Sequence, residues 1–194
     1  MTNFFLIRHA SCSGLGRTLW GRTPGICLNE KGKLQAQRLA DRFRAITLQA
    51  IYSSPLERTL ETAEALAYAM KLEVHRDNAF NEINFGDWTG KSFDSLSSDE
   101  RWHRFNSERE ATRIPGGESF LEVQNRAVTA LYAIHSQTKN ANVAIVSHAD
   151  VIKQRSATLR PLRSNRSNAL KFRRAQSESL HWINLVFFFV PFCG

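Results

Sequence analysis

Cysteine is scarce in this chain of 194 residues, in which only Cys12, Cys27 and Cys193 occur. Their number is odd and no two of them have a C-x-x-C spacing. The sequence therefore indicates neither a disulfide framework nor a cysteine-based zinc site. A reducing, cytoplasmic setting is the location that we expect.

The chain also lacks a hydrophobic run long enough to span a membrane. The longest run, INLVFFFVPFC at residues 183–193, is far shorter than the roughly 20 residues that a membrane helix requires, and it contains Pro191. The first ten residues have no basic leader ahead of a long apolar region, which argues against a signal peptide. We expect no membrane partner and interpret the run as a strand followed by a tail.

Acidic residues are outnumbered, because 18 Asp and Glu stand against 26 Lys and Arg, for a formal net charge of +8. The excess is local, since the stretch from Val151 to Ser177 holds eight basic residues and no acidic one. This divergent basic segment, residues 153–174, is interpreted either as a solvated face or as a surface that attracts polyanions. Its basic residues are Lys153, Arg155, Arg160, Arg163, Arg166, Lys171, Arg173 and Arg174.

Apolar runs that alternate with helical stripes predict an α/β fold, a three-layer α/β/α sandwich with a mainly parallel central sheet. The length suits a single domain over residues 1–194. Ser54 is expected to cap the second helix, with Pro55 at its first position. Residues 78–113 are expected to be irregular with short helices. Strands are expected within residues 3–7, 50–53, 71–76, 141–148 and 177–190, and helices within residues 29–46, 55–70, 115–136 and after His148.

Several polar residues follow the expected strands directly. His9 comes after the first strand, His148 after a later one, and Ser53-Ser54 ends a third strand with Arg58 one turn into the next helix. Ligands of parallel α/β sheets bind outside the carboxyl ends of the strands. We therefore expect these residues, which are distant in the sequence, to converge at one edge of the sheet.

Two residues near the first strand are candidate nucleophiles. A cysteine phosphatase loop needs a thiolate ringed by backbone amides and an arginine after five intervening residues. Only four residues separate Cys12 from Arg17. The shorter loop disfavours Cys12, which we interpret as a small, semi-buried loop residue, and favours His9.

Four motifs in order resemble the histidine phosphatase superfamily, the phosphoglycerate mutase-like proteins. They are IRHA at residues 7–10, YSSPLERTLETA at 52–63, FNEINFGDWTGKS at 80–92 and IVSHADVIK at 145–153. PGGES before a long helix is a further feature of this kind. The resemblance extends from Phe4 to about Ile152.

The resemblance implies a role for one residue or more in each of the four motifs. His9 would attack phosphorus and form a phosphohistidine, while Arg8, Arg58 and His148 would hold the phosphoryl oxygens. Glu82 would protonate the leaving oxygen and then, as a carboxylate, activate water. These residue types suit the chemistry, because guanidinium forks neutralise a phosphate with paired hydrogen bonds and neighbouring arginines favour a neutral imidazole. No metal and no cofactor are expected.

Other positions depart from the family's usual pattern. Ala10 stands where relatives usually have Gly, and the loop that follows differs, so its substrate contacts cannot be carried over. Arg17 and Arg22 in that loop are expected to be additional anion ligands. Asp87 is an alternative acid in the same stretch as Glu82, although Glu82 holds the position of the family's acid. After Lys153 the likeness fades.

The expected function is that of a metal-independent phosphomonoester hydrolase, a histidine acid-type phosphatase, that acts on a small phosphorylated metabolite. The compact chain and FGDWTG favour hydrolysis over a cofactor-dependent phosphoglycerate mutase, which is the first alternative. The second alternative is a non-catalytic, phosphatase-like protein that binds a polyanion through residues 153–174. We do not expect nucleic acid as the main partner, and the sequence leaves the substrate and the oligomeric state open, a homodimer included.

Overall fold

A computed structural model describes residues 2–109, 111–153, 169–172 and 183–188. In these residues a six-stranded sheet has the order β3-β2-β4-β1-β6-β5. All neighbouring strands are parallel except β5 and β6, which are antiparallel. The predicted α/β fold with a mainly parallel sheet is therefore confirmed. The strands are β1 (Thr2–Arg8), β2 (Ala50–Ser53), β3 (Val74–Arg76), β4 (Asn142–Ser147), β5 (Ala169–Phe172) and β6 (Ile183–Phe188).

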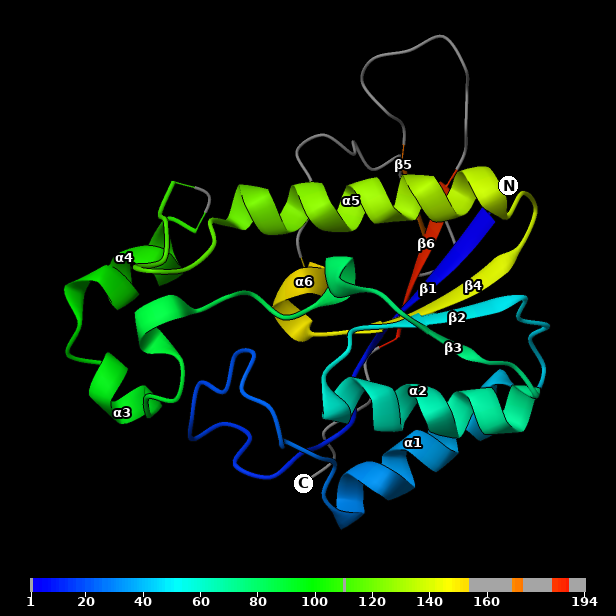
Figure 1. Cartoon of the computed structure of the whole chain (residues 1–194), viewed down its shortest axis with the longest axis horizontal. Coiled ribbons are helices and arrows are strands. Elements are labelled where there is room, and N and C mark those ends of the chain that lie inside the picture. Colours follow the sequence, from blue (N-terminus) through cyan, green and yellow to red (C-terminus); the bar gives the residue numbers. More distant parts are fainter. Residues whose placement is uncertain (1, 110, 154–168, 173–182, 189–194) are drawn as a thin grey trace, which may run out of the picture.

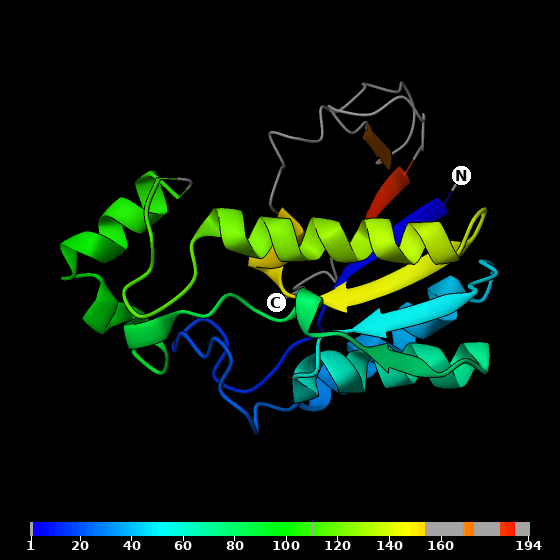
Figure 2. The same cartoon turned by 45° about the horizontal axis from the view of Figure 1, so that its top comes forward.

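Helices cover both faces of the sheet, as Figures 1 and 2 show. On one face lie α1 (Glu30–Phe43) and α2 (Glu57–Met70), and on the other lie α5 (Phe120–Gln137) and α6 (Ala149–Lys153). No helix in the described ranges is long and apolar enough to cross a membrane.

Side chains of β1 alternate between the two layers of the core. Phe4 and Leu6 belong to the apolar cluster beneath α5, whereas Phe5 and Ile7 belong to the cluster that packs against α1 and α2. Because both faces are buried, the strand reads as a continuous apolar run rather than an alternating one. This is why residues 3–7 can be recognised as a strand from the sequence.

The start of α2 differs from the prediction. Its N-cap is Leu56, without a side-chain hydrogen bond, so Ser54 is not the cap and Pro55 lies before the helix. The Ser54 hydroxyl is instead within 2.9 Å of Nε2 of His148 and 3.3 Å of Oδ1 of Asn81. Ser54 is thus part of the polar cluster at the strand ends rather than a helix cap.

Residues 84–116, which we call the side lobe, lie beyond the carboxyl ends of the strands (Figure 1). They hold the 3-10 turn η2 (Gly86–Trp88) and the short helices α3 (Phe93–Leu96) and α4 (Glu100–Ser107), and η1 (Asn78–Phe80) precedes them. The lobe has its own apolar cluster, which includes Phe85, Trp88 and Phe105. Short helices in an irregular stretch are as the sequence predicts.

Most of the divergent basic segment lies outside the described residues. Of residues 153–174, the structure describes only Lys153 and the backbone of β5. The strand β5 pairs with β6 and is not predicted from the sequence. Polyanion binding by this segment stays a prediction.

Candidate active site

The sheet brings the predicted histidines together. Arg8 is the last residue of β1 and pairs in register with Ser147, the last residue of β4. The backbone N–H of His9 donates to the carbonyl oxygen of Ser147 at 3.0 Å. The rings of His9 and His148 consequently lie edge to face, with their centroids 5.3 Å apart.

The ring of His9 is prepared as a neutral nucleophile. It is only 5% exposed, and its Nδ1 lies 2.8 Å from the carbonyl oxygen of Ala10. A carbonyl oxygen can only accept, so Nδ1 carries the proton and Nε2 keeps its lone pair. Burial and, to a smaller extent, the charges of Arg58 and Arg8 lower the pKa of His9 to about 3 against the opposing effect of the Ala10 bond. The imidazole is therefore uncharged at neutral pH.

The loop that carries His9 is fixed by α2. The N–H of Ala10 donates to Oγ1 of Thr62 at 3.1 Å, and the Thr62 hydroxyl donates to the carbonyl oxygen of Arg58 at 2.7 Å. Thr62 is fully buried. One hydroxyl thus joins the backbone of the candidate nucleophile to that of the candidate phosphate ligand.

Arg58 is a buried cation, and one of its donor groups, Nη1, is not used by the described residues. It lines the cavity together with Gly21, and its Nη2 donates to the carbonyl oxygen of Gly21 at 2.7 Å. Its Nη1 is buried and has no hydrogen-bond partner in the part of the chain that the structure describes. A buried donor of this kind is costly unless it is paired, and an oxygen of an anionic ligand would pair it.

His148 is held by both ring nitrogens. Its Nε2 lies 2.9 Å from Oγ of Ser54, and its Nδ1 lies 3.3 Å from Nη2 of Arg58 and 3.6 Å from Oε2 of Glu82. Burial lowers the pKa of His148 well below its usual range, and the neighbouring His9 and Arg58 add to this effect. The contact with Glu82 is therefore not an ion pair at neutral pH.

Glu82 is prepared as a proton donor. Its Oε1 accepts from the N–H of Ile83 at 2.9 Å, and its side chain is 12% exposed. Burial and, after it, the charge of Asp150 raise the pKa of Glu82 to about 8 against the opposing effects of the Ile83 bond and nearby arginines. The carboxyl group holds its proton at neutral pH.

A cavity of about 420 Å³ opens over these groups. Arg8, His9, Arg58 and Glu82 line it, and His148, which is not among the lining residues, contacts Arg58 and Glu82. The rest of the wall is mostly apolar and includes residues that the sequence does not single out for this purpose. These are Leu15, Leu19, Trp20, Phe85, Phe93 and Asp150.

Cys12 also lines the cavity but is not activated. Its side chain is buried, and burial raises the pKa of the thiol above its usual value despite the charges of Arg58 and Arg8. The thiol is therefore protonated at neutral pH and a weak nucleophile. This agrees with the preference for His9.

The two further arginines and the alternative acid lie elsewhere. Arg22 donates to the backbone carbonyl of Glu82 at 2.7 Å and pairs with Glu118 at 2.9 Å. Arg17 is exposed on the loop whose neighbouring residues border the cavity. Neither arginine nor Asp87 is among the residues that line the cavity, so their predicted parts in the site gain no support from this geometry.

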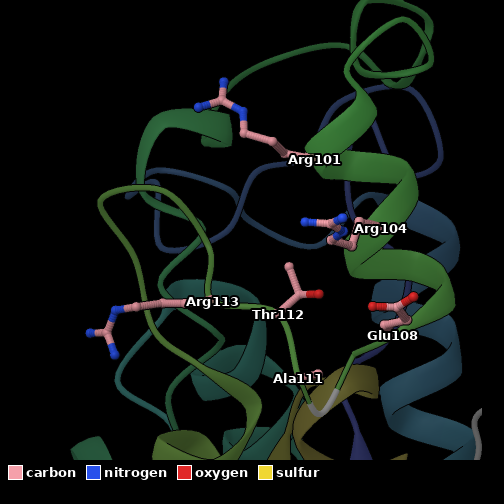
Figure 3. A pocket seen from close by; sticks show the side chains of 6 residues that line it. All are labelled: Arg101, Arg104, Glu108, Ala111, Thr112 and Arg113. Carbon is pink, nitrogen blue, oxygen red and sulfur yellow. The ribbon is translucent and has the colours of Figure 1, made fainter.

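A second cavity of about 330 Å³ lies between α4 and residues 111–113 (Figure 3). Arg104 points toward Thr112 in it, whereas the side chains of Arg101 and Arg113 point away. Arg101 and Arg113 form ion pairs with Asp99 and Glu122. None of the predicted site residues lines this cavity, and it has no candidate nucleophile.

Comparison with known proteins matches most of the chain to one superfamily. The sequence model of the histidine phosphatase superfamily (branch 1) matches residues 4–185. The chain is 35% identical over 156 residues to "Phosphoserine phosphatase 1" of Hydrogenobacter thermophilus, which covers 76% of this chain and 71% of that protein. It is 36% identical over 162 residues to "Phosphoglycerate mutase-like protein 4" of Arabidopsis thaliana, which covers 80% of this chain and 70% of that protein.

Solved structures show the same relationship. Bacillus stearothermophilus YhfR superposes with a TM-score of 0.74 at 33% sequence identity, and the match covers 79% of this chain and 77% of that one.

Proposed function

Because the chain belongs to the histidine phosphatase superfamily (branch 1), we propose that it hydrolyses phosphomonoesters of small metabolites through a phosphohistidine on His9, without a metal. The observation that carries this proposal is the state of His9. Burial lowers the pKa of its ring to about 3, its Nδ1 proton is given to Ala10, which leaves the lone pair on Nε2, and the residue lines the same cavity as Arg8 and Arg58. This combination suits nucleophilic attack on a bound phosphate.

In the first half of the proposed reaction, Arg8 and Arg58 hold the phosphoryl oxygens, and Nη1 of Arg58 supplies a donor that has no partner in the described protein. Nε2 of His9 forms a bond to phosphorus as the bond from phosphorus to the ester oxygen breaks. Glu82 gives its proton to the departing oxygen, so the leaving group departs as an alcohol. Both arginines stabilise the charge that spreads over the equatorial oxygens, and His148 contacts one of them, Arg58, from behind.

In the second half, Glu82 is a carboxylate and takes a proton from water. The water oxygen bonds to phosphorus, the bond from phosphorus to Nε2 of His9 breaks, and inorganic phosphate leaves. The raised pKa of Glu82 suits both halves, because a group with a pKa of about 8 can give and regain a proton near neutral pH.

Replacement of the two candidate nucleophiles tests the proposal. His9→Ala should abolish hydrolysis of p-nitrophenyl phosphate, while Cys12→Ser should keep it within a few-fold. Rapid quench with a radiolabelled phosphomonoester should trap an acid-labile label that His9→Ala lacks. A label that survives in His9→Ala and is lost in Cys12→Ser would overturn the assignment.

Mutase activity is the second candidate, because a relative that is 36% identical carries the name "Phosphoglycerate mutase-like protein 4". A mutase returns the phosphoryl group to another hydroxyl group instead of to water. A coupled assay for phosphate movement between the two hydroxyl groups of phosphoglycerate separates the candidates. Release of inorganic phosphate at a rate well above that of transfer supports the hydrolase.

A further inference from the structure

The lining residues that are not assigned to the reacting phosphate, which we call the leaving-group end of the cavity, have a charge pattern that the proposed chemistry does not use. Among the described residues that line the cavity, Arg8 and Arg58 are the basic ones, and both are assigned to the phosphate. Beyond them the wall is aromatic and aliphatic, with Asp150 as its charged member. A substrate's leaving group therefore meets apolar surface and a carboxylate.

Asp150 is held in place by an ion pair. It lies in the first turn of α6, two residues after His148, and its Oδ1 accepts from Nη1 of Arg109 at 2.9 Å. Arg109 is positioned in turn by two rings, since its guanidinium carbon lies 5.3 Å and 5.5 Å from the ring centroids of Phe105 and Phe120. Asp150 lines the cavity, and Arg109 approaches it from the side lobe without lining the cavity.

The negative charge of Asp150 acts inside the cavity in spite of this partner. After burial, it is the next largest cause of the raised pKa of Glu82, and it also raises the pKa of Arg8 against the effect of burial. The ion pair thus fixes the position of the Asp150 carboxylate, and the negative charge of this carboxylate still acts on Glu82 and Arg8.

We infer that Asp150 makes the leaving-group end selective for phosphomonoesters that carry a cationic amino group, and against those that carry a carboxylate. An ammonium group gains a counter-charge in a cavity where water is restricted, and its methylene groups contact the apolar wall. A carboxylate there meets a like charge, while the described cations of the lining are engaged with the phosphate. The inference rests on the proposed function for the position of the phosphate at Arg8 and Arg58.

Three esters of similar size and different charge test the inference: 2-aminoethyl phosphate, propyl phosphate and carboxymethyl phosphate. Their binding to His9→Ala is measured by calorimetry, so the result does not depend on turnover. The aminoethyl ester should bind at least about tenfold more tightly than the carboxymethyl ester. In the His9→Ala, Asp150→Asn double variant this ratio should fall toward one. No binding of any ester, or tightest binding of the carboxymethyl ester, would overturn the inference.

A second pair of variants separates charge from structure. Asp150→Asn and Arg109→Leu break the same ion pair but change the local charge in opposite directions. Arg109→Leu should increase the preference for the aminoethyl ester, whereas a merely structural role predicts that it mimics Asp150→Asn. Asp41→Asn is the matched control, because Asp41 pairs with Arg44 on α1 away from the cavity. A change in the ester ratio of this control as large as in Asp150→Asn would also overturn the inference.

Hydrolysis by the wild-type chain is scored separately. If p-nitrophenyl phosphate is not hydrolysed but the charge order of binding holds, the proposed function fails and the charge-selective subsite stands. If it is hydrolysed and the three esters bind equally, the proposed function stands and the inference fails.

Discussion

Thr62 shows how a single hydroxyl can position a reacting group that it does not touch. It accepts from Ala10 and donates to the carbonyl oxygen of Arg58, while the carbonyl oxygen of Ala10 accepts from Nδ1 of His9. Removal of the hydroxyl leaves the N–H of Ala10 buried without this acceptor. The peptide that orients the His9 ring is then free to move.

We predict that Thr62→Val, which keeps the shape of the side chain, lowers kcat about 10- to 100-fold with a smaller change in KM, because misorientation of a reacting group chiefly affects the transition state. The unfolding free energy should fall by about 1–3 kcal/mol, the cost of an unsatisfied buried donor. Steady-state kinetics and urea unfolding measure both. Thr62→Ser should restore most of kcat, and equal losses in the Val and Ser variants would show that the methyl group matters instead.

The protonation of Glu82 sets a second prediction at the scale of one residue. With an alkyl phosphate, kcat/KM should fall as the pH rises through about 8, since the carboxyl group then loses the proton that the leaving oxygen needs. It should fall at acid pH only as His9, with its pKa near 3, becomes protonated. Glu82→Gln should lower the rate about 10²- to 10⁴-fold and remove the alkaline limb.

The choice of leaving group provides the control for this prediction. A p-nitrophenolate leaves without help from an acid, so Glu82→Gln should slow formation of the phosphoenzyme far less with p-nitrophenyl phosphate than with the alkyl ester. An equal loss of that step with both esters would assign Glu82 to binding rather than to proton transfer. Stopped-flow measurement of the phenolate burst reports the step.

Sequence reasoning reaches residues of the site where a strand end fixes them, and the family resemblance adds Glu82, which also lines the cavity. His9, Arg58 and His148 were predictable because parallel strands end at one edge of the sheet. Arg22 was expected to bind an anion, yet it pairs with Glu118, 96 positions away. Its partner depends on how the side lobe packs against α5, which no local pattern shows. Asp150 was not predicted for the same reason, because it lines the cavity together with residues of the folded lobe.

Among whole elements, those with a strong internal pattern were predictable. The strands β1 and β4 are apolar throughout because both faces of the sheet are covered. The helix α5 begins at a capping box of Ser119 and Glu122, which a glycine turn precedes. The strand β5 was not predictable, since its antiparallel pairing with β6 is a long-range choice rather than a local preference. The start of α2 was wrong because Ser54 bonds to His148 instead of capping the helix.

The first turn of α1 gives a prediction at this scale. A Cβ atom at Gly32 would lie 1.9 Å from the carbonyl oxygen of Ser11, and Gln35 on the same helix accepts from the N–H of Ser11 at 2.9 Å. The helix therefore contacts the loop after His9 through backbone. Gly32→Ala should destabilise the fold by about 1–3 kcal/mol through overpacking, although Ala is normally better than Gly in a helix.

The same substitution should lower kcat/KM, because the loop after His9 must shift to admit the methyl group. Urea unfolding and steady-state kinetics on one preparation measure both effects. A gain in stability of about 1 kcal/mol, the usual helix effect, would mean that the close approach to Ser11 does not exist.

At the scale of the whole molecule, the sheet and the side lobe have different parts in the site. The strand ends place the candidate nucleophile and phosphate ligands, while the lobe supplies Phe85 and Phe93 to the cavity wall. Glu118 connects the lobe to α5, since it accepts from the N–H of Asn84 at the start of the lobe and pairs with Arg126, which donates to the backbone carbonyl of Glu82. The cavity wall therefore combines residues of both parts, because Asp150 comes from the helix after β4 and the two phenylalanines come from the lobe.

The buried ionisable groups of the site also make the stability of the whole molecule depend on pH. His9 and His148 have lowered pKa values in the folded chain, so the unfolded chain binds protons that the folded chain does not as the pH falls below 6.5. Glu82 has a raised pKa, so the folded chain keeps a proton that the unfolded chain releases as the pH rises from 4.5 toward 8. The unfolding free energy should fall on both sides.

We predict that the contribution of these three groups to stability is greatest near about pH 6.5, where the effect of the two imidazoles and that of the one carboxyl group balance. Where the folded and unfolded states differ by one bound proton, the unfolding free energy changes by at most about 1.4 kcal/mol per pH unit. His9→Ala should flatten the acid side by up to that slope, and Glu82→Gln should flatten the alkaline side. Urea unfolding between about pH 5 and 8 measures the slopes. If His9→Ala leaves the acid slope unchanged, the fold does not keep this imidazole neutral. The reason is that the slope measures the difference in bound protons between the unfolded and folded states, and the substitution removes the part that His9 contributes.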